Sequence, residues 1–119
     1  RVQERESKNT ELLLLKQWDA YKFDQYKIST ADALSSLLEW MNNKKLERLV
    51  TKTQLLIAPG YEFKIAKGLI TNFHQPQSTL LLLVAALIGN DWKKVYEYAL
   101  KNNFRFLSYG DGSLLWKKD

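Results

Sequence analysis

Apolar and polar residues follow one another along this chain in patterns that predict helices packed on strands. In the first half, Ser29 can cap a helix whose Asp32 reaches back to the exposed amides, as in a capping box. We expect this helix to end at Asn42-Asn43 and a second short helix to follow over residues 44–50. The apolar residues of the first helix recur at the spacing of one helical face, which should be buried in the core: Leu34, Leu37, Leu38 and Met41.

Two more helices are predicted in the second half of the chain. The apolar run that follows Ser78 and ends at Gly89 has no polar face, so we expect a helix that is sandwiched between layers. The next helix should start at Asn90 or Asp91 and end at Asn102-Asn103. Its inward stripe is predicted to be Trp92, Val95, Tyr96 and Ala99, with Lys93, Lys94, Glu97 and Lys101 facing water.

Short strands are predicted between these helices. The apolar residues of 11–23 suit either a strand or a short helix, and we favour the strand. A turn at residues 58–60 should end another strand, and Lys67-Gly68 should join the two arms of a hairpin. Helices and strands together predict an α/β fold, a mixed sheet with packed helices. The other predicted strands are 54–57, 61–65, 69–73, 105–109 and 113–116.

Composition limits the kinds of site that this chain can build. The 119 residues include no cysteine, so the chain has no disulfide or thiolate metal site, and a reducing, cytoplasmic compartment is compatible with it. The longest apolar run, residues 80–88, is about half as long as a bilayer-spanning helix, so we expect no membrane anchor. The net charge of +5 would attract phosphate backbones, although an ordinary solvated surface with scattered lysines would carry the same charge.

Three sequence blocks are more specific than composition: APGYEF at 58–63, GLITNFHQPQSTLLLLV at 68–84 and FRFLSYGDG at 104–112. In this order and at this spacing they resemble the C-terminal third of the S-adenosylmethionine:tRNA ribosyltransferase-isomerases of queuosine biosynthesis. The resemblance covers about residues 53–115. It implies that 28–119 is the C-terminal portion of a larger catalytic α/β domain. Residues 1–27 match nothing in the family, and the charged segment 1–10 is expected to be a poorly ordered lead-in.

The resemblance also implies a reaction and its partners. The family transfers the ribosyl part of S-adenosylmethionine to 7-aminomethyl-7-deazaguanine in tRNA and isomerises it to give epoxyqueuosine. S-adenosylmethionine is then a substrate, no separate cofactor is needed, and the intact enzyme is expected to be a cytoplasmic monomer. Because the chain opens on Arg1 and the family's upstream Thr-Thr-Ser…Arg block is not visible, we expect an inactive fragment that could self-associate.

The implied chemistry needs a group that moves a proton, and His74 in the second block is the natural candidate, since imidazole exchanges protons near neutral pH. On the residues alone, a single histidine could instead be a structural hydrogen-bonding group. Asn72 suits an adenine edge or a ribose hydroxyl, unless it only holds its own loop. Ser78 and Thr79 offer hydroxyls and free amides to a phosphate or carboxylate, although a plain N-cap would have the same sequence.

The third block holds four more candidates. Arg105 could clamp a carboxylate or phosphate, and Asp111, the second catalytic candidate, could lie near the sulfonium or orient a base. The alternative is an internal Arg–Asp pair that braces the turn. Ser108 and Tyr109 are assigned with Arg105 to substrate binding. In the first block, Glu62 is a further carboxylate candidate or else an ordinary solvent-facing residue.

Three positions depart from the family pattern. Gln75 stands where an apolar residue is commonest, Gln77 where lysine is common, and Gly112 where a small alkyl residue is usual. The missing lysine weakens the case for a phosphate held by charge at this loop.

Two other classes of function stay open on the sequence, a non-catalytic basic tRNA-binding module and a structural or oligomerisation domain. One observation separates the classes. Convergence of Asn72, His74, Arg105 and Asp111 in one pocket would favour the enzyme, whereas the same residues apart and exposed would favour either rival.

Overall fold

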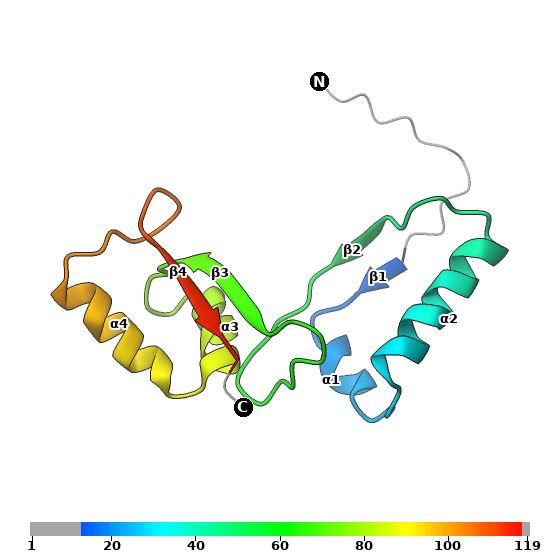
Figure 1. Ribbon diagram of the computed structural model, residues 1–119, viewed down its shortest axis with the longest axis horizontal. Coiled ribbons are helices and arrows are strands. Elements are labelled where there is room, and N and C mark those ends of the chain that lie inside the picture. The colour runs from blue at the N-terminus through cyan, green and yellow to red at the C-terminus, as the bar shows by residue number, and fades with distance from the viewer. Residues whose placement is uncertain (1–12, 118–119) are drawn as a thin grey trace, which may run out of the picture.

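The secondary-structure elements form two lobes, which Figure 1 shows side by side in a computed structural model that describes residues 13–117. The N-terminal lobe contains β1 (Leu13–Leu15), α1 (Asp19–Phe23), α2 (Thr30–Asn43) and β2 (Thr51–Thr53). The C-terminal lobe contains β3 (Gly68–Asn72), α3 (Thr79–Ile88), α4 (Asp91–Lys101) and β4 (Gly112–Trp116). One small sheet is parallel and the other antiparallel, so the predicted α/β fold with helices packed on strands is confirmed.

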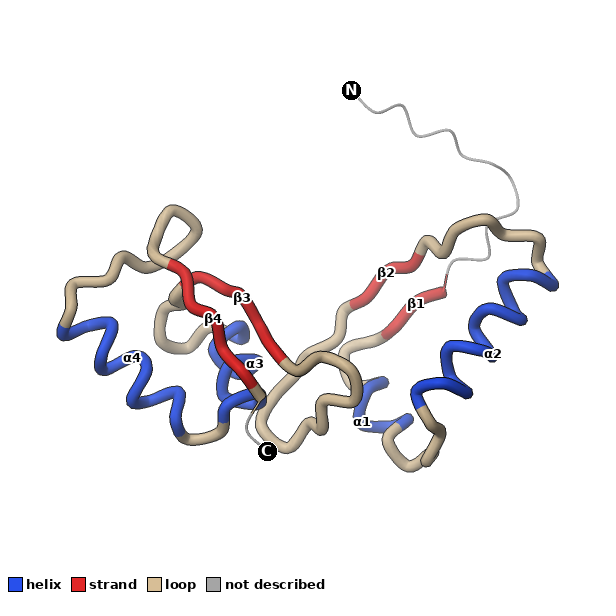
Figure 2. The backbone as a smooth tube through the Cα atoms, viewed as in Figure 1, coloured by secondary structure: helices blue, strands red, loops and turns tan. Residues whose placement is uncertain are grey.

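The two lobes give the molecule a long, flat shape. Its Cα radius of gyration is 18.1 Å, and its principal extents are 54 × 42 × 20 Å. A compact domain of this length would have a radius of gyration of about 13.5 Å. Residues 54–67, which contain no helix or strand, connect the lobes (Figure 2). Each lobe therefore has to be stabilised by its own contacts.

The hydrophobic core of the described residues lies in the C-terminal lobe. Val84 of α3 and Ala99 of α4 are fully buried, and Phe73, directly after β3, is 3% exposed. The Phe73 ring meets the rings of Tyr96 and Phe104 edge-on, with centroids 5.3 and 5.5 Å apart, an arrangement that aromatic quadrupoles favour. The inward stripe predicted for α4 is confirmed, because Tyr96 and Ala99 are buried while Trp92 and Val95 pack against the core.

Most helix ends lie where local capping residues predict them. The Ser29 hydroxyl accepts a hydrogen bond from the Asp32 amide at 3.1 Å, and the Ser78 hydroxyl accepts one from the Leu80 amide at 3.2 Å. Gly89 ends α3 in a left-handed conformation with φ of 59°, which glycine adopts without strain. Both N-caps satisfy amides that the helices leave without intrahelical partners.

The predictions for the face of α2 and for the segment after it are wrong. None of the α2 residues is buried, and Leu34 and Leu38 are 55% and 59% exposed. The helix ends at Asn43, as expected, and the left-handed residue that follows it is Lys45, with φ of 55°. Residues 44–50 form no second helix. The apolar spacing of α2 was interpreted correctly as a helix, but no other described element covers that face.

Several strand predictions are also wrong, because the observed pairs join segments far apart in the sequence. β3 pairs antiparallel with β4, with Ile70 opposite Leu114, so the hairpin between 61–65 and 69–73 does not form. Residues 54–57 and 105–109 are not strands. In the 11–23 segment, β1 ends at Leu15 and the helix α1 follows, so the preference for a single strand was only partly right. The lead-in predicted for 1–10 lies outside the described residues.

Apolar side chains remain exposed on both lobes. On the outer face of the β3–β4 pair, Ile70, Leu114 and Trp116 are 81%, 57% and 66% exposed. On α3, Leu80 is 50% exposed, so this helix is covered on one side only and is not sandwiched as predicted. A two-stranded sheet is at best marginally stable without further strands or helices against it. Among residues 13–117, no helix is long and apolar enough to cross a bilayer.

Candidate active site

The second and third sequence blocks meet at one end of the β3–β4 pair. Asn72 is the last residue of β3 and lies opposite Gly112, the first residue of β4. The Asn72 side chain donates from Nδ2 to the Gly110 carbonyl at 3.2 Å. Next to it, the Phe73 amide donates to the Asp111 carbonyl at 3.4 Å, and the Phe73 carbonyl accepts from the Leu107 amide at 2.9 Å. These bonds join residues 72–73 to 105–111, and His74 follows directly, so residues 72–74 and 105–111 are together called the loop cluster.

His74 is fixed within this cluster by two residues that the sequence did not single out as functional. Its backbone N–H donates to the Tyr96 hydroxyl of α4 at 3.0 Å. Its ring Nε2 lies 2.8 Å from the Thr71 Oγ1 of β3, within hydrogen-bonding distance. Tyr96 was assigned only to the core, and the helical stripe gave no sign that its hydroxyl reaches a loop. Thr71 could have been found from its place three residues before the only histidine.

Asp111 is engaged by Arg105 from the same loop. Its Oδ2 accepts from the Arg105 backbone amide at 2.7 Å, and its Oδ1 lies 3.5 Å from the guanidinium. These hydrogen bonds, the backbone one first, hold the pKa of the Asp111 carboxyl below its usual range. A carboxylate stabilised in this way is a weaker proton acceptor, and its contacts match the turn-bracing alternative. The catalytic role of Asp111 stays a prediction, as does substrate binding by Arg105, whose side chain is 75% exposed.

Gly110 lets this loop turn back on itself. A Cβ at this position would collide with the Arg105 carbonyl, while the Gly110 and Asp111 amides donate to Leu107 and Arg105 carbonyls at 2.8 and 2.9 Å. At Gly112, in contrast, a Cβ would find its nearest atom 3.8 Å away, at the Thr71 carbonyl. The two glycines of the GDG sequence therefore have different steric roles.

We expect Gly110→Ala to destabilise the C-terminal lobe by about 1–3 kcal/mol, the usual scale for a group forced into occupied space. Gly112→Ala should leave stability unchanged or slightly higher, because alanine loses less backbone entropy on folding. The thermal unfolding of both variants checks the pair. Equal losses of melting temperature would contradict the steric difference.

The remaining candidates of the two blocks lie at the edge of the cluster or away from it. Tyr109 is 97% exposed, and Ser108 is exposed as well. Ser78 and Thr79, at the start of α3, line a separate hollow of about 300 Å³ with Pro59 and Trp92. The Ser78 hydroxyl is already used as the N-cap of α3.

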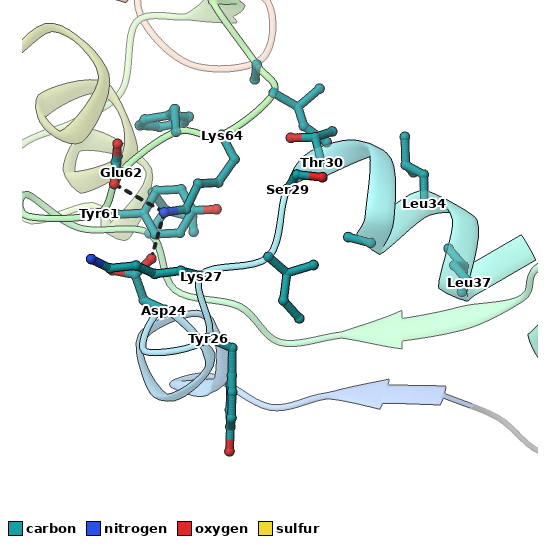
Figure 3. Close-up of a pocket in the computed structure, with 16 residues that line it drawn as sticks. Asp24, Tyr26, Lys27, Ser29, Thr30, Leu34, Leu37, Tyr61, Glu62 and Lys64 are labelled. Carbon is teal, nitrogen blue, oxygen red and sulfur yellow. Dashed lines mark hydrogen bonds and ion pairs between the residues drawn. The ribbon is translucent and has the colours of Figure 1, made fainter.

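Glu62 lies in another part of the molecule, beside a larger open pocket of about 1020 Å³ between residues 61–66 and the start of α2. Figure 3 shows Lys64 between two carboxylates, with Nζ 2.8 Å from Asp24 and 3.1 Å from Glu62. The hydrogen bonds to Asp24 and then Glu62 raise the pKa of Lys64. The structure thus separates Glu62 from His74.

The test that separates the function classes, convergence of Asn72, His74, Arg105 and Asp111 in one pocket, is met only in part. Asn72, Arg105 and Asp111 are hydrogen-bonded within the loop cluster, whereas His74 is bonded to Thr71 and Tyr96 instead. None of the four lines either of the two hollows just described. Within residues 13–117, no three histidine, aspartate or glutamate side chains gather as metal ligands. Arg105 of the cluster is exposed, whereas Asn72, His74 and Asp111 are half-buried.

The comparisons with known proteins agree on one family. The family described as queuosine biosynthesis protein matches residues 27–115. The S-adenosylmethionine:tRNA ribosyltransferase-isomerase of Ruegeria pomeroyi is 55% identical over 64 residues, which are 53% of this chain and 18% of that protein. The protein of the same name from Legionella pneumophila is 53% identical over 64 residues, 53% of this chain and 19% of that one.

A solved structure agrees with the sequence matches. A crystal structure of S-adenosylmethionine tRNA ribosyltransferase from Thermotoga maritima superposes with a TM-score of 0.52 at 45% identity, over 61% of this chain and 28% of that one. This chain spans less than a fifth of the length of the Ruegeria and Legionella relatives. Because the family match takes in well over half of its residues, this chain belongs to the family of queuosine biosynthesis proteins.

Proposed function

We propose that this chain supplies part of the active site of an S-adenosylmethionine:tRNA ribosyltransferase-isomerase. The observation that carries the proposal is the loop cluster, in which residues 72–73 are bonded to 105–111 at the end of the β3–β4 pair and His74 follows directly. Packing alone would not require the polar residues of both blocks to meet there. Polar groups held on a rigid support are what a catalytic site needs.

Each side chain of the cluster has a role in this proposal. His74 moves a proton at the ring, either from the carbon beside the sulfonium or to the departing adenine. Asn72 donates from Nδ2 to Gly110, so its Oδ1 can accept a hydrogen bond from the amino group of adenine. The exposed Arg105 guanidinium suits a tRNA phosphate, and the exposed Tyr109 ring suits a stacked base.

The substrates in this proposal are S-adenosylmethionine, as the ribosyl donor with no separate cofactor, and a tRNA that carries 7-aminomethyl-7-deazaguanine. The intact enzyme is proposed to work as a cytoplasmic monomer. The chain on its own would self-associate through exposed apolar residues such as Ile70, Leu114 and Trp116. These residues offer a second copy a face of the β3–β4 pair.

A non-catalytic tRNA-binding module is the second candidate. It is favoured by the net charge of +5 and by the exposed side chains of Arg105 and Tyr109. A binding module would need Arg105 and Tyr109 but would not need His74, which separates the two candidates.

A segment exchange tests the proposed function. Residues 53–115 of this chain replace the matching segment of the Ruegeria pomeroyi protein, and the chimera is incubated with S-adenosylmethionine and the modified tRNA. We expect adenine release near the parent's rate, whereas this chain alone should release none above background. A chimera exchanged only over 79–101 controls for helix packing. A folded 53–115 chimera without adenine release, beside an active 79–101 control, would contradict the proposal.

A further inference from the structure

Three hydrogen bonds fix the backbone around His74, so the orientation of the His74 ring is the conformational freedom that remains. Phe73 is bonded on both sides, through its amide to Asp111 and through its carbonyl to Leu107. The His74 amide is bonded to the buried Tyr96. A backbone fixed in this way leaves two variables for the imidazole, the side-chain torsion angles and the nitrogen that carries the proton.

Thr71 acts on the orientation of the ring. Its Oγ1 lies 2.8 Å from Nε2 of His74, and no other described group is hydrogen-bonded to the ring. Thr71 itself is fixed, since its backbone pairs with Ser113 across the sheet. A hydroxyl can donate to a ring nitrogen or accept from it, so this bond fixes the orientation of the ring and engages Nε2 in either tautomer.

We propose that Thr71 is a positioning residue that holds Nε2 of His74 and leaves Nδ1 as the atom that exchanges a proton with the ligand. The hydroxyl can donate to Nε2 or accept from it, and in both cases the bond occupies Nε2. The hydrogen bond between Thr71 and His74 fixes the orientation of the His74 ring before a ligand binds. The effect on turnover rests on the function proposed above, whereas the effect on the ring does not.

The only histidine of the chain makes the ring directly observable. Imidazole ¹⁵N chemical shifts of the 119-residue chain, recorded where the ring is neutral, should report a hydrogen bond at Nε2, and side-chain couplings should report one ring orientation. Thr71→Val keeps the shape of the side chain but removes the hydroxyl, so the Nε2 signal should shift and the ring should sample several orientations. Thr71→Ser keeps the hydroxyl and should retain the wild-type shifts. Ser113→Ala, which removes a neighbouring hydroxyl that does not touch the ring, is the matched control.

The same variants in the full-length enzyme should separate positioning from packing. Thr71→Val should lower turnover by about 10- to 100-fold, the scale of a misplaced reacting group, and Thr71→Ser should restore most of it. Unchanged ¹⁵N shifts in Thr71→Val would overturn the hydrogen bond. Unchanged turnover in Thr71→Val beside an inactive His74→Ala would overturn the positioning role.

Two further outcomes are decisive as well. If Thr71→Val shifts the ring signals while His74→Ala keeps full turnover, the hydrogen bond is supported and the proposed role of His74 in proton transfer is the part that fails. If Thr71→Val does not fold, the wild-type spectrum decides, because side-chain couplings that show the His74 ring averaging over several orientations would overturn the inference.

Discussion

His74→Ala in the intact enzyme should lower turnover by about 100-fold or more while the protein stays folded. The expected size is that of removing a general acid or base from a reacting centre. Folding should survive because the core contacts of this loop come from Phe73, and the His74 amide can still donate to Tyr96 in the variant. Single-turnover adenine release measures the chemical step.

Gln75→Ala provides the control for His74, because Gln75 is the next residue, is exposed and is not assigned a role. It should release adenine at the wild-type rate. Near wild-type turnover in a well-folded His74→Ala enzyme would remove His74 from the site. Tyr109 and Arg105 would then remain as surface contacts of the tRNA-binding alternative.

Phe73→Ala should cost the C-terminal lobe about 3–5 kcal/mol, the range for removing a buried aromatic side chain. The ring is 3% exposed and contacts three other aromatic rings, of Tyr96, Phe104 and Phe106. Its loss would leave a cavity between α4 and the loop cluster. Hydrogen exchange at the amides of α3 and α4 should therefore accelerate strongly.

Phe23→Ala is the matched change in the other lobe, where the Phe23 ring is 54% exposed. It should leave exchange in α3 and α4 unchanged. Similar acceleration of α3 and α4 by both variants would show that the two lobes unfold together and that burial of Phe73 is not the cause.

The helices could be predicted because their determinants are local. Ser29, Ser78 and Gly89 each act within one helical turn, so a short stretch of sequence contains the whole interaction. The face of α2 was predicted to be buried because its apolar spacing shows which side avoids water. That spacing does not show whether another helix or strand packs against the apolar face.

The strands were harder to predict because pairing depends on partners that are remote in sequence. Lys67-Gly68 looked like a local hairpin turn, yet β3 takes its partner from residues 112–116. The functional site likewise combines features that the sequence predicts with contacts that it does not. The sequence blocks predicted which polar residues matter, and their convergence could not follow from spacing, since Asn72 meets Gly110 only through the β3–β4 pairing. The Tyr96 hydroxyl was missed because it reaches His74 from a separate helix, whereas the Thr71 hydroxyl lies only three residues from His74 and could have been found locally.

The pairing of β3 with β4 also determines when the loop cluster can exist during folding. α3 and α4 lie entirely between the two strands in the sequence, so local contacts can form these helices first, while closing β3 on β4 costs loop entropy. Ribosomes deliver the chain from its N-terminus, so His74 emerges well before its partner segment at 105–111. A nascent chain stalled before Gly112 has every candidate catalytic group in its sequence and still has no β4 to hold those groups together.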